Sequence, residues 1–95
     1  MFYLNVWLTV QEPAHVERIA GLLSQLGSRS RQEPGCVRFE VYHSEADATR
    51  FLLSEHWESR AHWETHRTAA AFTEIYQPQV LPFVNREPHI SRLLD

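Results

Sequence analysis

The chain has 95 residues, of which 43% are hydrophobic and 12% aromatic, and these proportions fit one folded globular domain spanning residues 1–95. Its formal net charge of −3, with no lysine among the nine basic residues, argues against nucleic-acid binding, a lysine Schiff base and a P-loop lysine. No apolar run is long enough to cross a bilayer and the amino terminus lacks the basic start of a secretory signal, so we expect a cytoplasmic protein without a membrane partner.

The first part of the chain predicts a strand followed by a helix. Apolar and more polar side chains alternate over residues 2–10, and a period of two residues is typical of a strand. Pro13 suits the first turn of a helix, and apolar residues then recur at helical spacing from Val16 to Leu26. We therefore expect a helix over residues 13–31, and a stop at Gly27 is an equally consistent interpretation.

Two further strands are predicted in the middle of the chain. The segment Glu33-Pro34-Gly35 is typical of a turn, and residues 36–43 alternate directly after it. A second alternating segment covers residues 50–58. The polar residues between these segments predict a hairpin with a longer loop.

The last third predicts two short helices and a final strand. Ser59 suits the N-cap of a helix that carries His66 on its inward stripe. Thr68 suits the cap of a second helix, which we expect Pro78 to interrupt. The final strand is expected over residues 89–94.

This order of elements predicts an α+β protein with a ferredoxin-like split βαβ fold, in which helices cover one face of a four-stranded antiparallel sheet. The side chains of Tyr3, Trp7 and Tyr42 then fall on the other face. Because that face also needs a cover, we expect a homodimer in which two sheets pack face to face.

Several short segments, at their spacing, carry a family resemblance. They are Glu33-Pro34-Gly35-Cys36, the strand Val37–Tyr42, and Phe51–Trp57 followed by His66 and Phe72. Over nearly the whole chain, the sequence resembles the antibiotic biosynthesis monooxygenase family, which includes quinol monooxygenases. The resemblance implies a dimeric α+β barrel with a pocket in each subunit between sheet and helices. It also implies oxidation of phenols or hydroquinones by O2, with no metal, flavin or haem as cofactor.

Individual positions match the branches of this family unevenly. Trp57 matches a strand tryptophan of the polyketide quinone-forming enzymes. An asparagine, a tyrosine and an arginine of their pocket are replaced here by Leu53, Trp63 and Gln77. The asparagine, tryptophan and histidine of the haem-degrading branch are replaced by Val6, His66 and Tyr76, so the resemblance does not imply haem degradation.

His66 is the first candidate catalytic residue. An imidazole that titrates near neutral pH can accept a phenolic proton, and a deprotonated quinol transfers an electron to O2 more readily than a neutral one. Helical spacing places His66 on the inward stripe beside Trp63. The alternative is a core histidine that is hydrogen-bonded to backbone or to Glu55.

Glu55 is the second candidate catalytic residue. It lies between Leu53 and Trp57 on the inward face of its strand, where a carboxylate must be paired or protonated. It would either orient His66 or act as the base itself. The alternative is an ion pair with an arginine such as Arg38 or Arg50.

An aromatic slot is the expected binding site for a planar substrate. The candidate substrate-binding residues are Trp57, Trp63, Tyr76, Phe39, Leu53 and Phe72. Aromatic residues at these spacings also occur as ordinary core. His62 and His66 stand four residues apart, but the intervening pattern is not a zinc motif, so no metal is expected.

Together these features predict a cofactor-independent monooxygenase that oxidises a small hydroquinone or polyphenol with O2. One alternative keeps the pocket and makes the protein an isomerase of a small phosphorylated carbonyl compound. The other is a dimeric ligand-binding module without catalytic activity.

Overall fold

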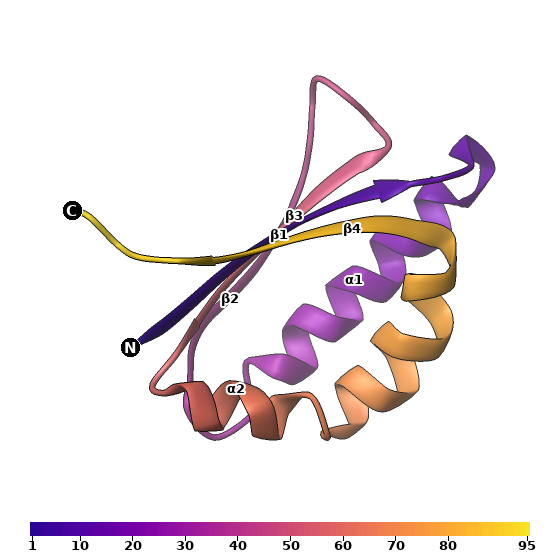
Figure 1. Ribbon diagram of the computed structural model, residues 1–95. Coiled ribbons are helices and arrows are strands. Elements are labelled where there is room, and N and C mark those ends of the chain that lie inside the picture. The colour runs from indigo at the N-terminus through magenta and orange to yellow at the C-terminus, as the bar shows by residue number, and fades with distance from the viewer.

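A four-stranded antiparallel sheet, covered on one face by helices, forms the computed structural model, which describes residues 1–95 (Figure 1). The strands are β1 (Phe2–Val10), β2 (Cys36–His43), β3 (Arg50–Trp57) and β4 (Val84–Ser91). Their order across the sheet is β2-β3-β1-β4, so β2 and β4 are the edges. The expected ferredoxin-like fold and its one-sided helical layer are confirmed.

The helical layer contains two α-helices and three less regular segments. The α-helices are α1 (Val16–Ser30) and α2 (Arg60–His66). The short 3-10 turn η1 (Pro13–His15) leads into α1, and a π-helix, η2 (Ala71–Val80), is followed by a second 3-10 turn, η3 (Leu81–Phe83). No helix is long and apolar enough to span a membrane.

A single core fills the space between the sheet and these helices. The alternating residues of β1 that include Leu4, Val6 and Leu8 are buried, and they meet Ile19 and Leu23 of α1. Burial of one such aliphatic side chain contributes roughly 1.5–3 kcal/mol to stability. The strict alternation of β1 therefore fixes which face of the sheet receives the helices.

The last strand differs from the prediction. It begins at Val84 and ends at Ser91, whereas we expected it over residues 89–94. It pairs with β1 as an edge strand, and at the edge of a sheet solvated polar side chains and Pro88 are tolerated. Because Asn85, Arg86 and Glu87 are exposed, the segment lacks the hydrophobic alternation that marks a strand.

The second helix also differs from the prediction. Thr68 does not cap it; the helix begins after Ala70, and the Thr68 hydroxyl donates to the carbonyl of Thr65. Pro78 lies inside the helix rather than ending it. Proline has no N–H to donate within the helix, and beside Pro78 the side-chain amide of Gln79 donates to the carbonyl of Glu74 at 2.9 Å.

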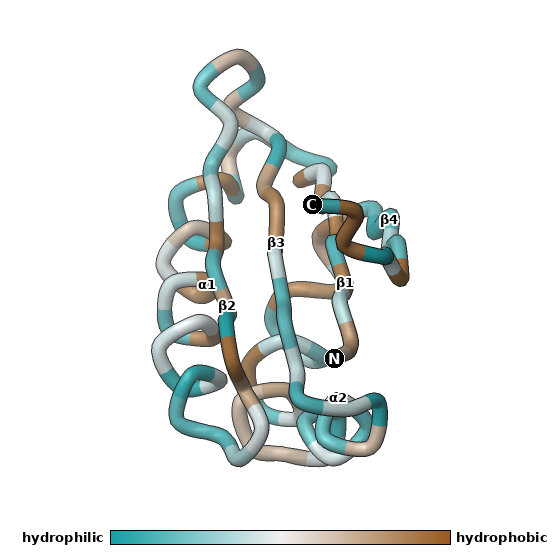
Figure 2. Tube along the Cα trace, turned by 90° about the vertical axis from the view of Figure 1, so that its left-hand side faces the viewer, coloured by the Kyte–Doolittle hydropathy of each residue, from teal (hydrophilic) through white to brown (hydrophobic).

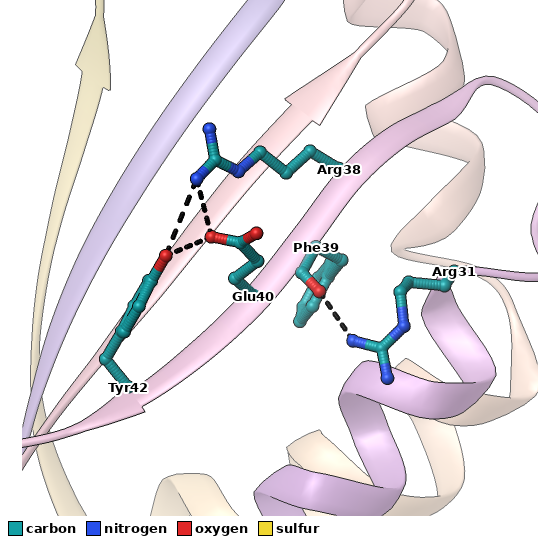
Figure 3. Close-up of polar contacts among 5 residues, drawn as sticks. All are labelled: Arg31, Arg38, Phe39, Glu40 and Tyr42. Atoms are coloured by element: carbon teal, nitrogen blue, oxygen red, sulfur yellow. Dashed lines mark hydrogen bonds and ion pairs between the residues drawn. The ribbon is translucent and has the colours of Figure 1, made fainter.

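The other face of the sheet has no covering element within the chain, and Figure 2 looks directly onto it. Tyr3 and Trp7 are half-buried there, and Tyr42 is exposed. On β2, an Nη of Arg38 donates to a carboxylate oxygen of Glu40 at 2.7 Å, and the Tyr42 hydroxyl contacts the same carboxylate (Figure 3). The open face is therefore aromatic and polar.

At the outer edge, Arg31 holds the end of α1 against β2. Its Nη1 donates to the carbonyl of Phe39 at 2.7 Å (Figure 3). Gly27 of α1 lies close to the Val41 side chain on the same strand, where a Cβ would come within 3.3 Å of a valine methyl carbon. A small residue therefore allows this close approach of helix and edge strand.

Gly35 provides a stability test for the turn between α1 and β2. It adopts φ +80°, and a Cβ at this position would overlap the ring of His62. We expect Gly35→Ala to lower the free energy of unfolding by about 2 kcal/mol or more. Gly21→Ala is the matched control, because a Cβ there meets nothing within 4 Å; it should raise stability by roughly 0.5–1 kcal/mol. Urea unfolding measures the free energy of unfolding of both variants, and equal effects would contradict the role assigned to Gly35 in the turn.

Candidate active site

The side chain of His66 is fixed in the core between α2 and the sheet. Ser59 begins α2 as an N-cap, its hydroxyl accepting from the backbone N–H of His62 at 3.2 Å, and His66 is the last residue of this short helix. The His66 ring lies 4.6 Å from the Trp57 ring centroid and 5.7 Å from that of Phe72. Its side chain is only 3% exposed.

A carboxylate holds this ring in one orientation. Nδ1 of His66 lies 2.7 Å from a carboxylate oxygen of Glu33, whose side chain is 15% exposed. Because a carboxylate only accepts hydrogen bonds, Nδ1 carries the proton in this pair. In the neutral imidazole Nε2 is then the basic nitrogen, and it makes no hydrogen bond to the protein.

Burial and Glu33 act on the pKa of His66 in opposite directions. Burial lowers the pKa below its ordinary value and is the larger effect, while the hydrogen bond and the negative charge of Glu33 raise it. The net pKa is lowered, so the ring is neutral near pH 7. It can therefore accept a proton, and Glu33 would stabilise the imidazolium that results.

Glu55 is a second buried titratable group of the site. It is 4% exposed, and Trp57 donates its indole N–H to the carboxyl group at 3.0 Å. Burial raises the pKa of Glu55 to about 7, against the opposing effects of the Trp57 hydrogen bond and the charge of Arg86. At neutral pH, Glu55 can either give or take a proton.

These two groups line the same small cavity between sheet and helices. Its volume is about 20 Å³, enough for one water molecule or the hydroxyl of a larger ligand. An aromatic ring does not fit inside it. Of the residues predicted from sequence, the following line this inner cavity: Phe39, Leu53, Glu55, Trp63, His66, Phe72 and Tyr76.

A larger pocket adjoins the inner cavity. It measures about 240 Å³ and shares five lining residues with the cavity: Trp63, Arg67, Phe72, Tyr76 and Arg86. Gln77 and Leu81 complete its lining. Pockets for drug-sized ligands occupy about 300–1,000 Å³, so this outer pocket suits a smaller molecule.

Three contacts differ from the sequence-based interpretation. Trp57 does not line the cavity; it is fully buried and holds Glu55 through its indole N–H. His66 is oriented by Glu33 and not by Glu55. Glu55 forms no ion pair with either arginine considered above, because Arg38 pairs with Glu40 and the Arg50 guanidinium lies over the Trp7 ring.

Sequence reasoning missed three polar residues of the site. Glu33 was read only as part of a turn, although it lies between a predicted helix and a predicted strand and so at one end of the helical layer. Arg86 was missed because its strand was placed too late; its pairing with Leu8 puts it on the inward-facing set of β4. Arg67 directly follows the helix that ends at His66, and this position next to a candidate catalytic residue is the one feature of the sequence that could have indicated its place in the site.

Two other reactive side chains are engaged elsewhere. Nδ1 of His62 lies 2.7 Å from the Ser59 hydroxyl rather than near His66. Burial and then the charge of Glu33 raise the pKa of the Cys36 thiol to about 11, so it is a protonated thiol at neutral pH.

Comparison with known proteins identifies the class. The sequence model of antibiotic biosynthesis monooxygenases matches residues 1–78, and the chain belongs to this family. Membership supports a monooxygenase-like function in general terms. An uncharacterized protein of Synechocystis sp., sll1783, is 30% identical over 66 residues, which cover 70% of this chain and 45% of that protein.

Solved structures agree on the fold. A crystal structure of an antibiotic biosynthesis monooxygenase superposes with a TM-score of 0.90 at 20% identity and covers 100% of both chains. A protein of Nitrosomonas europaea with the same family designation gives a TM-score of 0.87 at 23% identity, covering 98% of this chain and 99% of its own. At these identities, the likeness establishes the fold alone.

The raised pKa of Glu55 predicts a pH-dependent cost to stability. The unfolded carboxyl ionises near its ordinary value of 4.5, whereas the folded one stays neutral up to about pH 7. The stability that this group contributes is therefore complete below pH 4.5 and is lost as the pH rises to about 7. The loss is on the order of 3 kcal/mol.

Glu55→Gln removes this dependence, and we expect urea unfolding of the variant to show a flatter stability profile than the native protein between pH 4.5 and 7. His66 acts in the opposite sense, since its lowered pKa makes stability rise with pH. That contribution is present in both proteins, so their difference isolates Glu55. Parallel profiles would contradict the assignment.

Proposed function

We propose that this protein is a cofactor-independent monooxygenase that oxidises a small hydroquinone or polyphenol with O2. The single observation that carries the proposal is the Glu33–His66 pair beside a cavity that adjoins a larger pocket. A carboxylate-oriented neutral imidazole is a competent general base. Glu55 supplies a second group that exchanges protons at neutral pH.

The volumes of the inner cavity and the outer pocket determine how the substrate would lie. Its ring occupies the outer pocket against Trp63 and Phe72, and one hydroxyl points into the inner cavity. The proton passes to Nε2 of His66 directly or through one water in that cavity. The protein's contribution is to hold the ring, remove this proton and keep the anion away from bulk water.

The oxidation then proceeds between the substrate anion and O2. One electron passes to O2, and recombination of the two radicals forms a C–O bond at a ring carbon that carries hydrogen. Loss of that hydrogen as a proton and cleavage of the O–O bond convert the ring C–H to a carbonyl. One oxygen atom stays in the quinone product, and the other leaves as water with protons returned from His66 and Glu55.

A second candidate is an isomerase of a small phosphorylated carbonyl compound. His66, whose lowered pKa leaves the ring neutral near pH 7, and Glu55, whose pKa is raised to about 7, line one cavity, and such a pair can move a proton between adjacent carbons without O2. Turnover that continues at the same rate under anaerobic conditions separates this candidate from the monooxygenase.

We further propose a homodimer through the open face of the sheet. Trp7 and Leu52 are half-buried and Tyr42 is exposed on this face, where they are register neighbours on adjacent strands. Aromatic residues on an uncovered sheet are typical of an interface core. Face-to-face packing would leave the helical side and both pockets free for substrate.

Oxygen uptake with simple quinols tests the proposed reaction. We expect enzyme-dependent uptake above autoxidation, and His66→Gln should lower it roughly 10²–10⁴-fold, the usual contribution of general base catalysis. Glu33→Gln should reduce the rate less and move the acid limb of the pH profile to lower pH, because Glu33 raises the pKa of His66.

The matched control is His89→Gln, since His89 pairs with Glu87 at 3.0 Å on the exposed surface of β4. This variant should keep native activity. Absence of uptake above the background, or full activity of His66→Gln, would reject the mechanism.

Sedimentation equilibrium tests the dimer. We expect a mass twice the 11.2 kDa of the single chain. Leu52→Glu places a charge at the centre of the open face and should shift the protein to monomer. Gln25→Glu is the control, because Gln25 is exposed on α1 on the helical side. A native protein that sediments as a monomer, or a Leu52→Glu dimer, would contradict the proposal.

A further inference from the structure

The outer pocket is lined by positively charged side chains and by no acidic one. Two of its seven lining residues, Arg67 and Arg86, are cationic. A carboxyl group, Glu55, lines the adjoining inner cavity, where burial raises its pKa to about 7. The chain as a whole has a net charge of −3 and twelve acidic residues against nine basic ones. A pocket that holds two arginines and no carboxylate therefore departs from the charge balance of the rest of the protein.

Neither arginine is used in an ion pair. Three of the nine arginines, at positions 29, 38 and 60, pair with Glu74, Glu40 and Glu64, and Arg67 and Arg86 are among the six that have no acidic partner within salt-bridge distance. Both are exposed to solvent. Pairing with an acidic side chain, the usual structural role of arginine, therefore does not explain these two residues.

Local contacts hold both guanidinium groups at the pocket. Nε of Arg86 donates to the Tyr76 hydroxyl at 3.1 Å, which leaves its two terminal nitrogens free to donate. The Arg67 guanidinium lies 5.1 Å from the centroid of the Trp63 ring. Each arginine is thus positioned by an aromatic residue that lines the same pocket, and a guanidinium fork matches the two oxygens of a carboxylate.

We propose that Arg67 and Arg86 form an anion-binding subsite, and that the substrate is a small aromatic compound bearing a carboxylate. This inference rests on the proposed function for the identity of the pocket. Both arginines line the inner cavity as well as the outer pocket, so they stand where the two spaces meet. An anionic group bound there anchors one end of the ring and directs the rest of the ligand toward Trp63 and Phe72.

Binding of non-oxidisable probes tests the subsite independently of turnover. Isothermal titration with 4-methoxybenzoate and the neutral 4-methoxybenzamide compares two molecules of nearly the same shape. We expect the benzoate to bind at least ~10-fold tighter, the scale of a charged hydrogen bond. This preference should weaken as the salt concentration rises.

Variants assign the preference to the two arginines. Arg86→Gln and Arg67→Gln should each reduce benzoate affinity roughly 10-fold and change benzamide affinity by no more than about twofold. Arg86→Lys keeps the charge and should retain part of the preference, which separates lost charge from lost folding. Arg29→Gln is the control for a change of one charge, since Arg29 lies on α1 paired with Glu74 and outside both pockets; it should bind both probes like the native protein.

Three results would contradict a subsite for the carboxylate of an aromatic substrate. They are equal affinity of the native protein for benzoate and benzamide, an unchanged preference in both glutamine variants, and tighter binding of phenyl phosphate than of benzoate, which would replace the carboxylate with a phosphate. Because the probes are not oxidised, a clear benzoate preference in a protein that consumes no O2 would sustain the subsite and reject only the oxidation. Oxygen uptake by a protein that binds benzoate and benzamide equally would sustain the oxidation and reject the subsite.

Discussion

The hydrogen bond between Glu33 and His66 joins two parts of the chain that are 33 residues apart, and the chemistry of the site depends on it. Glu33 comes from the turn between α1 and β2, and His66 ends α2. A buried imidazole without a partner would lose about 1–3 kcal/mol to desolvation. The contact therefore satisfies the ring, selects its tautomer and ties the turn to the helix above the sheet.

A second buried carboxyl group gives the site its particular character. Glu55 has no ion-pair partner, and the Trp57 indole is its one hydrogen-bond donor in the protein. The Glu33 side chain is partly exposed and contacts His66, whereas Glu55 is buried between sheet and helices. The same side-chain chemistry thus serves two purposes: Glu33 supports the charge of a neighbour, and Glu55 exchanges its own proton.

Much of the fold could be predicted from the sequence, because four segments show a strong period. The alternation of β1, β2 and β3 and the helical stripe of α1 each reflect one buried face, and all were placed within three residues of their bounds. β4 was misplaced because an edge strand buries little and needs no such pattern. The helix over residues 71–80 was predicted with the wrong cap, because the Thr68 hydroxyl donates to the carbonyl of Thr65, and Pro78 is accommodated inside the helix instead of interrupting it.

The site was less predictable than the fold. Strand and helix periods correctly turned His66 and Glu55 inward, but a period gives the direction of a side chain and not its partner. Which carboxylate reaches His66 depends on how the turn after α1 packs against α2, and this arrangement is decided by the whole core. The small volume of the inner cavity likewise depends on the fit of several aromatic rings that no spacing rule describes.

Neither edge strand of the sheet offers an uninterrupted row of free backbone hydrogen-bonding groups. On β2, the carbonyl of Phe39 is already occupied by the Arg31 guanidinium, and on β4, Pro88 offers no N–H. A stray strand that approached either border would find its hydrogen-bonding ladder interrupted. The open face of the sheet can therefore be exposed while both edge strands disfavour the addition of strands from further copies of the chain. Such edge-to-edge addition is the first step toward fibrils.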